Sequence, residues 1–306
     1  MRVLVLGAGA TGAYFGARLI QSGRAVSFLV RPARADVLRR DGLRVHSTQG
    51  DFASAVDLLT AVPPNTTFDL ILLACKAYDL DAAVAAITPA VGPDSRVLPL
   101  LNGLRHLDRL DLAFGADRVL GGLCHISVAQ QPDGSVLHLG QLQRLTFGAR
   151  APDARLDELA PALLAVPAEV RRSERIIDAM WEKFAFLATL AAMTCLMRGT
   201  IGDLVATPDG AALAQRCYAE ACAIAAAEGH AVAATAQSEA TATLTAVSSP
   251  LQASMLRDLR RGATTECEHI VGDLIGRGAV HGIDMPLLRA AAAHLRVYER
   301  GRGGDV

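Results

Sequence analysis

MRVLVLGAGATG, residues 1–12, is the stretch that decides the fold of this chain. Within it, an apolar run at residues 3–6 precedes three glycines, and residues 13–19 continue with the apolar spacing of a helix. A dinucleotide-binding turn requires this order, because glycines allow a tight turn, a close approach of the backbone to a pyrophosphate and close packing of helix on strand. The N-terminus of the helix also offers free N–H groups to phosphates. We therefore predict a nucleotide site at Gly7, Gly9, Ala10, Thr11 and Gly12, with a purely structural turn as the alternative.

The end of the next predicted strand indicates which dinucleotide binds. Residues 25–30 form this strand, and Arg31 follows them. About 20 residues past the glycines, an NAD-binding fold usually has an acidic residue for the ribose 2′-hydroxyl, whereas an arginine there accommodates a 2′-phosphate. Arg34 lies close behind, and the first carboxylate is that of Asp36. NADP is therefore the predicted cofactor, with Arg31 among its ligands. An NAD site, with Arg31 as an ordinary solvated arginine, is the alternative.

Two further apolar strands end at polar residues. The strand predicted at residues 68–75 is followed by Lys76, and the strand at residues 97–101 by Asn102. Ligands of open α/β sheets bind at the carboxyl ends of the strands, so both side chains are placed to meet the cofactor. A solvated loop lysine and a turn-forming asparagine are the alternatives.

The sequence pattern divides the chain into two domains. Up to residue 172 strands alternate with helices, and two hairpins are expected, one at residues 43–55 and one around Asp133 and Gly134. Beyond Ser173 the strand patterns vanish and alanine-rich helical stretches follow. The predicted fold class is α/β, with a Rossmann-type doubly wound sheet at residues 1–172 followed by an all-helical domain at residues 173–306. The later elements expected are short strands at 119–123, 135–139 and 145–147, a helix at 153–166, an edge strand at 169–172, helices at 176–197, 210–228, 235–246, 251–261, 265–276 and 287–299, and a poorly anchored tail at 301–306.

Composition argues against several functions. The chain has 306 residues and a formal net charge of −1, which gives no electrostatic reason to expect nucleic acid or an anionic membrane as a partner. Its six cysteines include no CxxC pair, so neither a metal site nor a disulfide framework is expected. The N-terminal residues do not resemble a secretory signal, and the longest nearly apolar stretch, residues 184–197, is too short to cross a bilayer. We therefore expect a cytoplasmic protein, whose apolar helix faces would also suit a homodimer.

Three polar residues in the helical half are candidates for chemistry. Lys183 lies within a mostly apolar helix, where a lysine either extends its charge to solvent or serves a site. Ser254 and Glu266 belong to the segment SMLRDLRRGATTE, and Glu266 is expected in the first turn of a new helix with Thr264 as its cap. A carboxylate that only stabilises the helix dipole is the alternative for Glu266.

Together, these segments resemble one family. GAGATGAYFG, FLVR, CKAYD, LLNGL, WEKF and SMLRD…TE are similar, over essentially the whole chain, to the ketopantoate reductases, which are 2-dehydropantoate 2-reductases. The resemblance implies an NADP-binding Rossmann domain, a helical domain and an active site in the cleft between them. The residue roles it implies are a proton-donating Lys183, an active-site Glu266 beside the cofactor, a substrate-binding Ser254, Asn102 near nicotinamide and substrate, and Arg31 and Lys76 near the 2′-phosphate.

One departure from the family pattern concerns the substrate. Members that act on ketopantoate typically have asparagines one and two helical turns after the lysine, where this chain has Leu187 and Ala191. Because these positions share a helix face with Lys183, the strip beside the lysine is apolar. The predicted reaction is NADPH-dependent reduction of a 2-oxo acid, 2-dehydropantoate to pantoate in pantothenate biosynthesis. The alternatives are a related reductase of a more hydrophobic 2-oxo or 3-oxo acid and a non-catalytic NADP-binding sensor.

Overall fold

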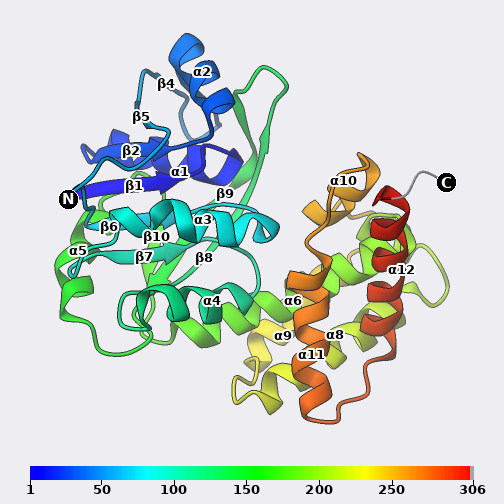
Figure 1. Ribbon diagram of the computed structural model, residues 1–306. Coiled ribbons are helices and arrows are strands. Elements are labelled where there is room, and N and C mark those ends of the chain that lie inside the picture. The colour runs from blue at the N-terminus through cyan, green and yellow to red at the C-terminus, as the bar shows by residue number, and fades with distance from the viewer. Residues whose placement is uncertain (304–306) are drawn as a thin grey trace. The chain divides into compact units, whose positions relative to one another are not determined.

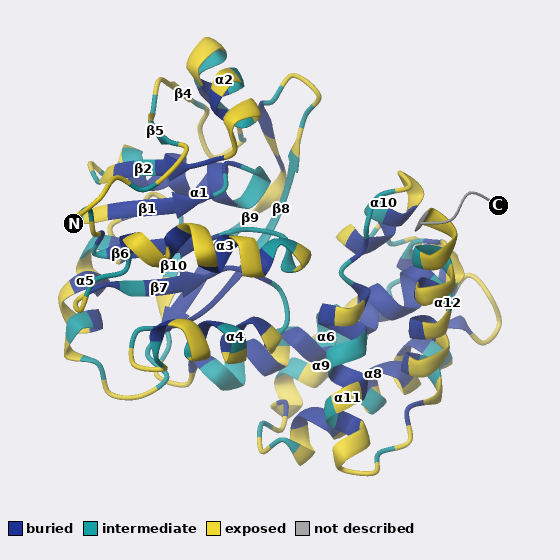
Figure 2. Cartoon of the chain, in the orientation of Figure 1, coloured by how far each residue is buried: buried dark blue, intermediate teal, exposed yellow. Residues whose placement is uncertain are grey.

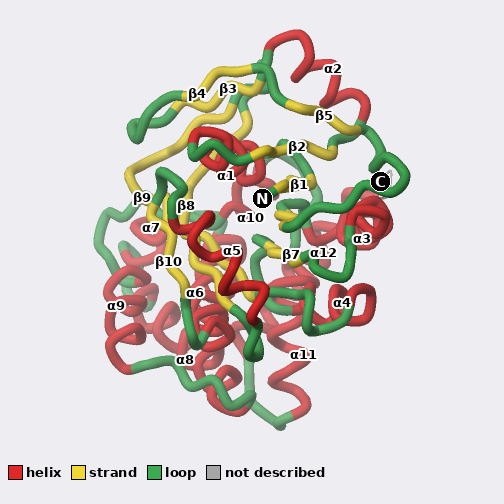
Figure 3. The backbone as a smooth tube through the Cα atoms, turned by 90° about the vertical axis from the view of Figure 1, so that its left-hand side faces the viewer, coloured by secondary structure: helices red, strands yellow, loops and turns green. Residues whose placement is uncertain are grey.

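The computed structural model describes residues 1–303, and the chain divides into two compact units. Unit 1 consists of Met1–Asn102 and His106–Ile176, and unit 2 consists of Gly103–Arg105 and the chain from Ile177 onward. In Figure 1, the colour of unit 1 runs from blue to green and that of unit 2 from green to red. The strands, yellow in Figure 3, all belong to unit 1, whereas the elements of unit 2 are helices.

Unit 1 contains a five-stranded sheet, sheet A, in which every neighbouring pair of strands is parallel. Its order is β5-β2-β1-β6-β7. Strands in such sheets are buried on both faces, and β6, with the sequence LILL, is buried at every position. This order confirms the predicted Rossmann-type sheet, while the short edge strand β5 was not predicted. The bounds are β1 (Arg2–Leu6), β2 (Ala25–Leu29), β5 (Asp57–Leu59), β6 (Leu70–Leu73) and β7 (Arg96–Pro99).

Helices follow the strands of unit 1. The sequence did not predict α4, because charged side chains interrupt the apolar pattern of its sequence, RHLDRLDLAF. The helices are α1 (Ala10–Gln21), α2 (Pro32–Asp41), the short 3₁₀ turns η1 (Ala77–Asp79) and η2 (Thr88–Ala90), α3 (Leu80–Ile87), α4 (Arg105–Phe114) and α5 (Ala154–Leu164).

A second sheet, sheet B, has the order β10-β9-β3-β4, with β8 paired to β9. The predicted hairpin around Asp133 and Gly134 joins β8 to β9. The three short strands expected here were wrong in extent, because β9 continues through the polar residues 140–144. On β8, His125 lies opposite Arg144 and Ile126 opposite Gln143, and after a register shift the pairing resumes at Val128 opposite His138. The bounds are β3 (Leu43–His46), β4 (Phe52–Ser54), β8 (Gly121–Gln130), β9 (Val136–Gly148) and β10 (Glu169–Arg172).

Helix α1 lies between the two sheets. It contacts β1 and β2 of sheet A and β3, β8 and β9 of sheet B, and its residues from Gly12 to Leu19 are all buried. Arg18 is only 1% exposed, and its guanidinium donates hydrogen bonds to the Gly50 carbonyl oxygen at 2.8 Å and to Gln21 Oε1 at 2.7 Å. The helix is therefore fixed on both sides.

Unit 2 is built around α6, whose predicted bounds are confirmed. Among residues 1–303, α6 is the one helix long and apolar enough to cross a membrane, but about two thirds of its apolar window (67%) is buried within the protein. Figure 2 shows much of α6 and α8 in the dark blue of buried residues. The helices are α6 (Ile176–Met197), α7 (Ile201–Val205), α8 (Gly210–Ala227), α9 (Ala234–Leu244), α10 (Ser254–Arg260), the π-helix η3 (Glu268–Gly272), α11 (Asp273–Val280) and α12 (Pro286–Gly303).

Two predictions for this half need correction. The single helix expected at residues 265–276 is instead a π-helical turn followed by α11. Residues 301–303 of the expected tail continue α12, where Arg302 Nε donates to the Gly262 carbonyl oxygen at 2.7 Å. The rest of that tail, residues 304–306, lies outside the described residues.

Candidate active site

The glycine-rich turn links β1 to α1 and has no room for side chains at its narrowest point. Gly7 has φ +88°, in the left-handed region that favours glycine, and its N–H donates to the Leu29 carbonyl oxygen at 3.0 Å. A Cβ on Gly12 would lie 2.1 Å from the Gly7 carbonyl oxygen and 3.2 Å from the Ala74 Cβ. A Cβ on Gly9 would meet nothing within 4 Å, so the space beside this residue is open. The turn is a cradle of backbone that fits a pyrophosphate.

The first turn of α1 adds a favourable field for an anion. Gly9 is the N-cap residue, no side chain caps the helix, and its first turn contains no acidic residue. The N–H groups and the positive end of the helix dipole therefore favour phosphate. Ala10 and Thr11 form this turn and are half-buried. The structure thus brings the five predicted residues together at the carboxyl end of β1, and their contact with the cofactor remains a prediction.

Arginines at the start of α2 lie beside the same turn. Arg31 follows β2, and its Nη2 forms an ion pair with Asp79 Oδ1 at 2.7 Å. Arg34 Nε donates to the carbonyl oxygen of Ala8, within the turn, at 3.0 Å, and burial lowers the pKa of Arg34. Neither contact could be predicted from the sequence, because each joins residues that follow different strands. Arg34 therefore connects α2 to the glycine turn.

Lys76 and Asn102 follow β6 and β7. Both side chains are half-buried, and Lys76 is the residue that precedes η1. Because the strands of sheet A are parallel, the residues after β1, β2, β6 and β7 lie along one edge of the sheet. The structure therefore places the glycine turn, Arg31, Lys76 and Asn102 along that edge.

The remaining predicted residues belong to unit 2. Lys183 is half-buried on α6 between Trp181 and Phe184, which are 3% and 1% exposed. Its own helix face continues with Leu187, which is half-buried, and Ala191, which is 2% exposed. The apolar strip predicted beside the lysine is therefore present, and the second of its positions is closed to solvent.

Ser254 and Glu266 lie at the beginnings of helical elements. Ser254 is the first residue of α10 and is exposed, and Glu266 is half-buried just before η3. The expected Thr264 cap is wrong, because the Thr264 hydroxyl accepts a hydrogen bond from Arg302 Nη1 at 2.9 Å. Instead, the Glu266 carbonyl oxygen accepts the N–H groups of His269 at 3.1 Å and of Ile270 at 3.0 Å. No signal in the sequence predicted the π-helix, although such turns are frequent at functional sites.

No disulfide joins any of the six cysteines, all of which lie within residues 1–303. Burial raises the pKa of Cys195 and of Cys267 to about 12, so neither of these two is an activated nucleophile. Within residues 1–303, no three His, Cys, Asp or Glu side chains are grouped in a way that would hold a metal ion.

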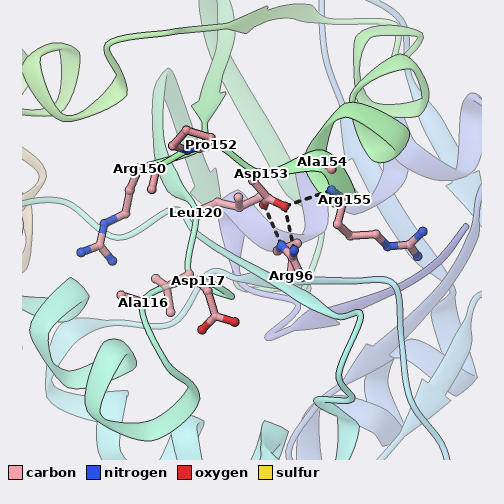
Figure 4. A pocket seen from close by; sticks show the side chains of 12 residues that line it. Arg96, Ala116, Asp117, Leu120, Arg150, Pro152, Asp153, Ala154 and Arg155 are labelled. Carbon is pink, nitrogen blue, oxygen red and sulfur yellow. Dashed lines mark hydrogen bonds and ion pairs between the residues drawn. The ribbon is translucent and has the colours of Figure 1, made fainter.

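A cavity of about 320 Å³ lies at the amino-terminal ends of the strands of sheet A, beside the first residue of β7 (Figure 4). Here Arg96 forms two hydrogen bonds with Asp153, from Nε and Nη2, both at 2.7 Å, and their side chains are 12% and 9% exposed. Asp153 Oδ1 also accepts the Arg155 N–H at 3.0 Å and so caps α5. Arg96, Asp153 and the Arg155 N–H therefore bond to one another and fasten β7 to the start of α5, which is a structural arrangement.

We expect Asp153→Asn to lower the free energy of unfolding by about 3 kcal/mol at neutral pH, because it leaves a nearly buried guanidinium without its charge partner. The hydrogen bonds from Arg96 hold the pKa of the Asp153 carboxyl below its usual range. The contribution is therefore fully present above the unfolded-state pKa and is lost as the pH falls through the lower folded-state pKa. Urea denaturation should show the difference between wild type and variant narrowing below about pH 4.

The exposed pair of Asp81 with Arg109 provides the control for this prediction. Asp81→Asn should change the free energy of unfolding by no more than about 0.5 kcal/mol. An equal loss of unfolding free energy in Asp153→Asn and Asp81→Asn would contradict the structural role given to Asp153.

Similarities to known proteins extend over both units. The family model described as ketopantoate reductase PanE/ApbA matches residues 3–152, and its C-terminal counterpart matches residues 175–299. The uncharacterized oxidoreductase YkpB of Bacillus subtilis (strain 168) is 36% identical over 301 residues, which cover 98% of this chain and 99% of that protein. The 2-dehydropantoate 2-reductase of Halobacterium salinarum is 30% identical over 304 residues, with coverage of 98% and 99%. A crystal structure of a PanE/ApbA family ketopantoate reductase from Ralstonia eutropha JMP134 superimposes with a TM-score of 0.89 at 26% identity, covering 99% of this chain and all (100%) of that one.

Proposed function

Since this chain belongs to the ketopantoate reductase family, we propose that it reduces 2-dehydropantoate to pantoate, a step of pantothenate biosynthesis. As a member of this family it is an NADP-dependent oxidoreductase acting on CH–OH groups, and its chemistry is the reduction of 2-oxo acids. The observation that carries the proposal is Lys183, a half-buried cation on an otherwise apolar helix face. A binding protein without catalysis has no need of such a residue.

The residues proposed to hold the cofactor are those along one edge of sheet A. The glycine cradle and the N-terminus of α1 would take the pyrophosphate, and Arg31 and Lys76 would take the 2′-phosphate. When bound, the cofactor supplies the hydride for the carbonyl carbon. Asn102 would orient the nicotinamide and the substrate through an amide that both donates and accepts hydrogen bonds.

Unit 2 would provide the proton and the substrate anchor. The Lys183 ammonium would donate a hydrogen bond to the substrate carbonyl oxygen and transfer its proton as negative charge develops there. Glu266 would hold either this lysine or the ribose of the cofactor, and a nearby carboxylate favours the charged form of a partly buried lysine. The Ser254 hydroxyl would bind the substrate carboxylate, for which its exposed position is suitable.

A second candidate is a reductase of a more hydrophobic 2-oxo or 3-oxo acid. It is favoured by Leu187 and Ala191, which leave the helix face beside Lys183 without amides. A pocket without hydrogen-bond donors loses its preference for a hydroxylated substrate. An assay that measures the oxidation of NADPH through the loss of its absorbance, with ketopantoate and with a panel of alkyl and aryl 2-oxo acids, distinguishes the two candidate functions. Fastest turnover with ketopantoate supports the proposal, whereas no oxidation with any acid would support a non-catalytic NADP-binding sensor.

Leu187→Asn should raise the kcat/KM ratio of ketopantoate to a branched-chain 2-oxo acid by about tenfold, because an added amide can bond the substrate hydroxyl. Leu187 is half-buried, so it tolerates an amide better than the closed position of Ala191. Steady-state kinetics with both acids measure the ratio. A ratio that stays the same would mean that this face of α6 does not contact the substrate.

The other proposals concern the protein as a whole. We infer functional domains at residues 1–172 and 173–306, a cytoplasmic location, and a small-molecule substrate as the only partner other than a second copy of the chain. Size-exclusion chromatography with light scattering tests the homodimer directly.

A further inference from the structure

The ion pair between Arg31 and Asp79 joins two different strand ends. Arg31 follows β2, and Asp79 is the last residue of η1, after β6. Strands β2 and β6 flank β1 in sheet A, so the pair lies between elements on either side of the strand that leads into the glycine turn. Arg31 Nη2 and Asp79 Oδ1 are 2.7 Å apart, and the side chains are 76% and 34% exposed. The guanidinium is open to a ligand while it is already bound to a carboxylate.

A ligand phosphate and this carboxylate would compete for one cation. A phosphate monoester carries between one and two negative charges at neutral pH, and an anion bound by Arg31 would lie as near to the guanidinium as Asp79 does. Like charges held by one guanidinium repel each other. A ribose 2′-hydroxyl carries no charge and is not repelled.

We propose that Asp79 is a specificity-determining residue that lowers the preference of this protein for 2′-phosphorylated over unphosphorylated dinucleotides by holding Arg31. The inference rests on the proposed function, in which Arg31 binds the 2′-phosphate. Asp79 also orders the arginine, but an exposed ion pair stabilises one side-chain conformation only weakly, so repulsion outweighs preorganisation.

Dissociation constants of NADP⁺ and NAD⁺, measured by isothermal titration calorimetry, test the proposal. Asp79→Asn keeps the shape of the side chain and removes its charge, and Asp79 makes no capping hydrogen bond to α3 whose loss would disturb the helix. We expect NADP⁺ to bind about 3- to 10-fold more tightly to this variant at low salt, with NAD⁺ affinity changed by less than about twofold. The gain should shrink as salt screens the charges.

Asp36→Asn is the matched control, because it removes the same charge from α2, where Asp36 pairs with Arg39. It should leave both dissociation constants unchanged. An equal gain in NADP⁺ affinity in Asp79→Asn and Asp36→Asn would overturn the proposal, since the change in net charge alone would then explain that gain. Unchanged or weaker NADP⁺ binding to Asp79→Asn would overturn it as well.

Arg31→Ala separates this inference from the function on which it rests. It should reduce the preference for NADP⁺ over NAD⁺. An unchanged preference would show that Arg31 lies outside the phosphate site, so the proposed role of Arg31 would fail independently of the result for Asp79→Asn. A reduced preference in Arg31→Ala together with no gain in Asp79→Asn would overturn the inference alone. In the double variant the gain from Asp79→Asn should largely disappear, and a gain of full size would contradict competition for Arg31.

Discussion

Lys183→Ala is expected to lower turnover by about 10²- to 10⁴-fold and to leave NADPH affinity nearly intact. The reason is that the ammonium would act only on the substrate carbonyl, whereas the residues proposed for the pyrophosphate and the 2′-phosphate of the cofactor belong to unit 1. Single-turnover oxidation of NADPH measures the chemical step, and fluorescence titration measures cofactor affinity.

Glu182→Gln is the control for the lysine. Glu182 neighbours Lys183 on α6 but is exposed, so its substitution should leave turnover within about twofold of wild type. Turnover that survives Lys183→Ala would remove the lysine from the proton-donating role and, with it, the main support for the proposed reaction.

Gly9→Ala and Gly12→Ala should both abolish tight cofactor binding, for different reasons. An alanine Cβ at Gly9 meets no protein atom within 4 Å and its φ of −74° suits any residue, so this variant should fold normally. Its methyl group would occupy the space into which a pyrophosphate must come, and we expect the NADPH dissociation constant to rise at least about 100-fold. At Gly12 the Cβ would lie 2.1 Å from the Gly7 carbonyl oxygen, so the turn itself must distort.

Thermal unfolding distinguishes the two glycine variants. The melting temperature of Gly12→Ala should be several degrees lower than that of wild type, because the free energy of unfolding falls by about 2 kcal/mol or more. Gly9→Ala should melt at the same temperature as wild type. Gly276→Ala provides a further control, because its Cβ also meets nothing within 4 Å and it lies within α11. Normal NADPH affinity in Gly9→Ala would show that the turn is only structural.

The predictable parts of this fold are those specified by local sequence. The apolar strand before the glycines and the alternating strands after it predicted sheet A, and the bounds of α6 were predicted to the residue. In sheet B the hairpin of β8 and β9 was predicted from its turn, but the pairing of β9 with β3, about 90 residues earlier, and with β10, beyond α5, could not be derived in this way.

The candidate site shows the same division. Positions at strand ends, such as Arg31 and Asn102, follow from the rule that ligands bind at the carboxyl ends of parallel strands. The partners of these residues do not follow, and the contact between Arg31 and Asp79 joins residues 48 positions apart. For Glu266 the local pattern predicted a helix start, and its carbonyl oxygen does accept the Ile270 N–H; the π-helical turn at residues 268–272 that follows has no simple sequence signature.

The position of α1 between two sheets has a thermodynamic consequence for cofactor binding. Packing on both sides of α1, whose residues from Gly12 to Leu19 are all buried, holds the helix and its phosphate-binding N-terminus in one place before any ligand arrives. Little conformational entropy is then lost at the pyrophosphate, and most of the ordering on binding falls to the exposed side chains around the adenosine end. Evolution can therefore retune dinucleotide choice through a few surface residues without disturbing the rigid end of the helix.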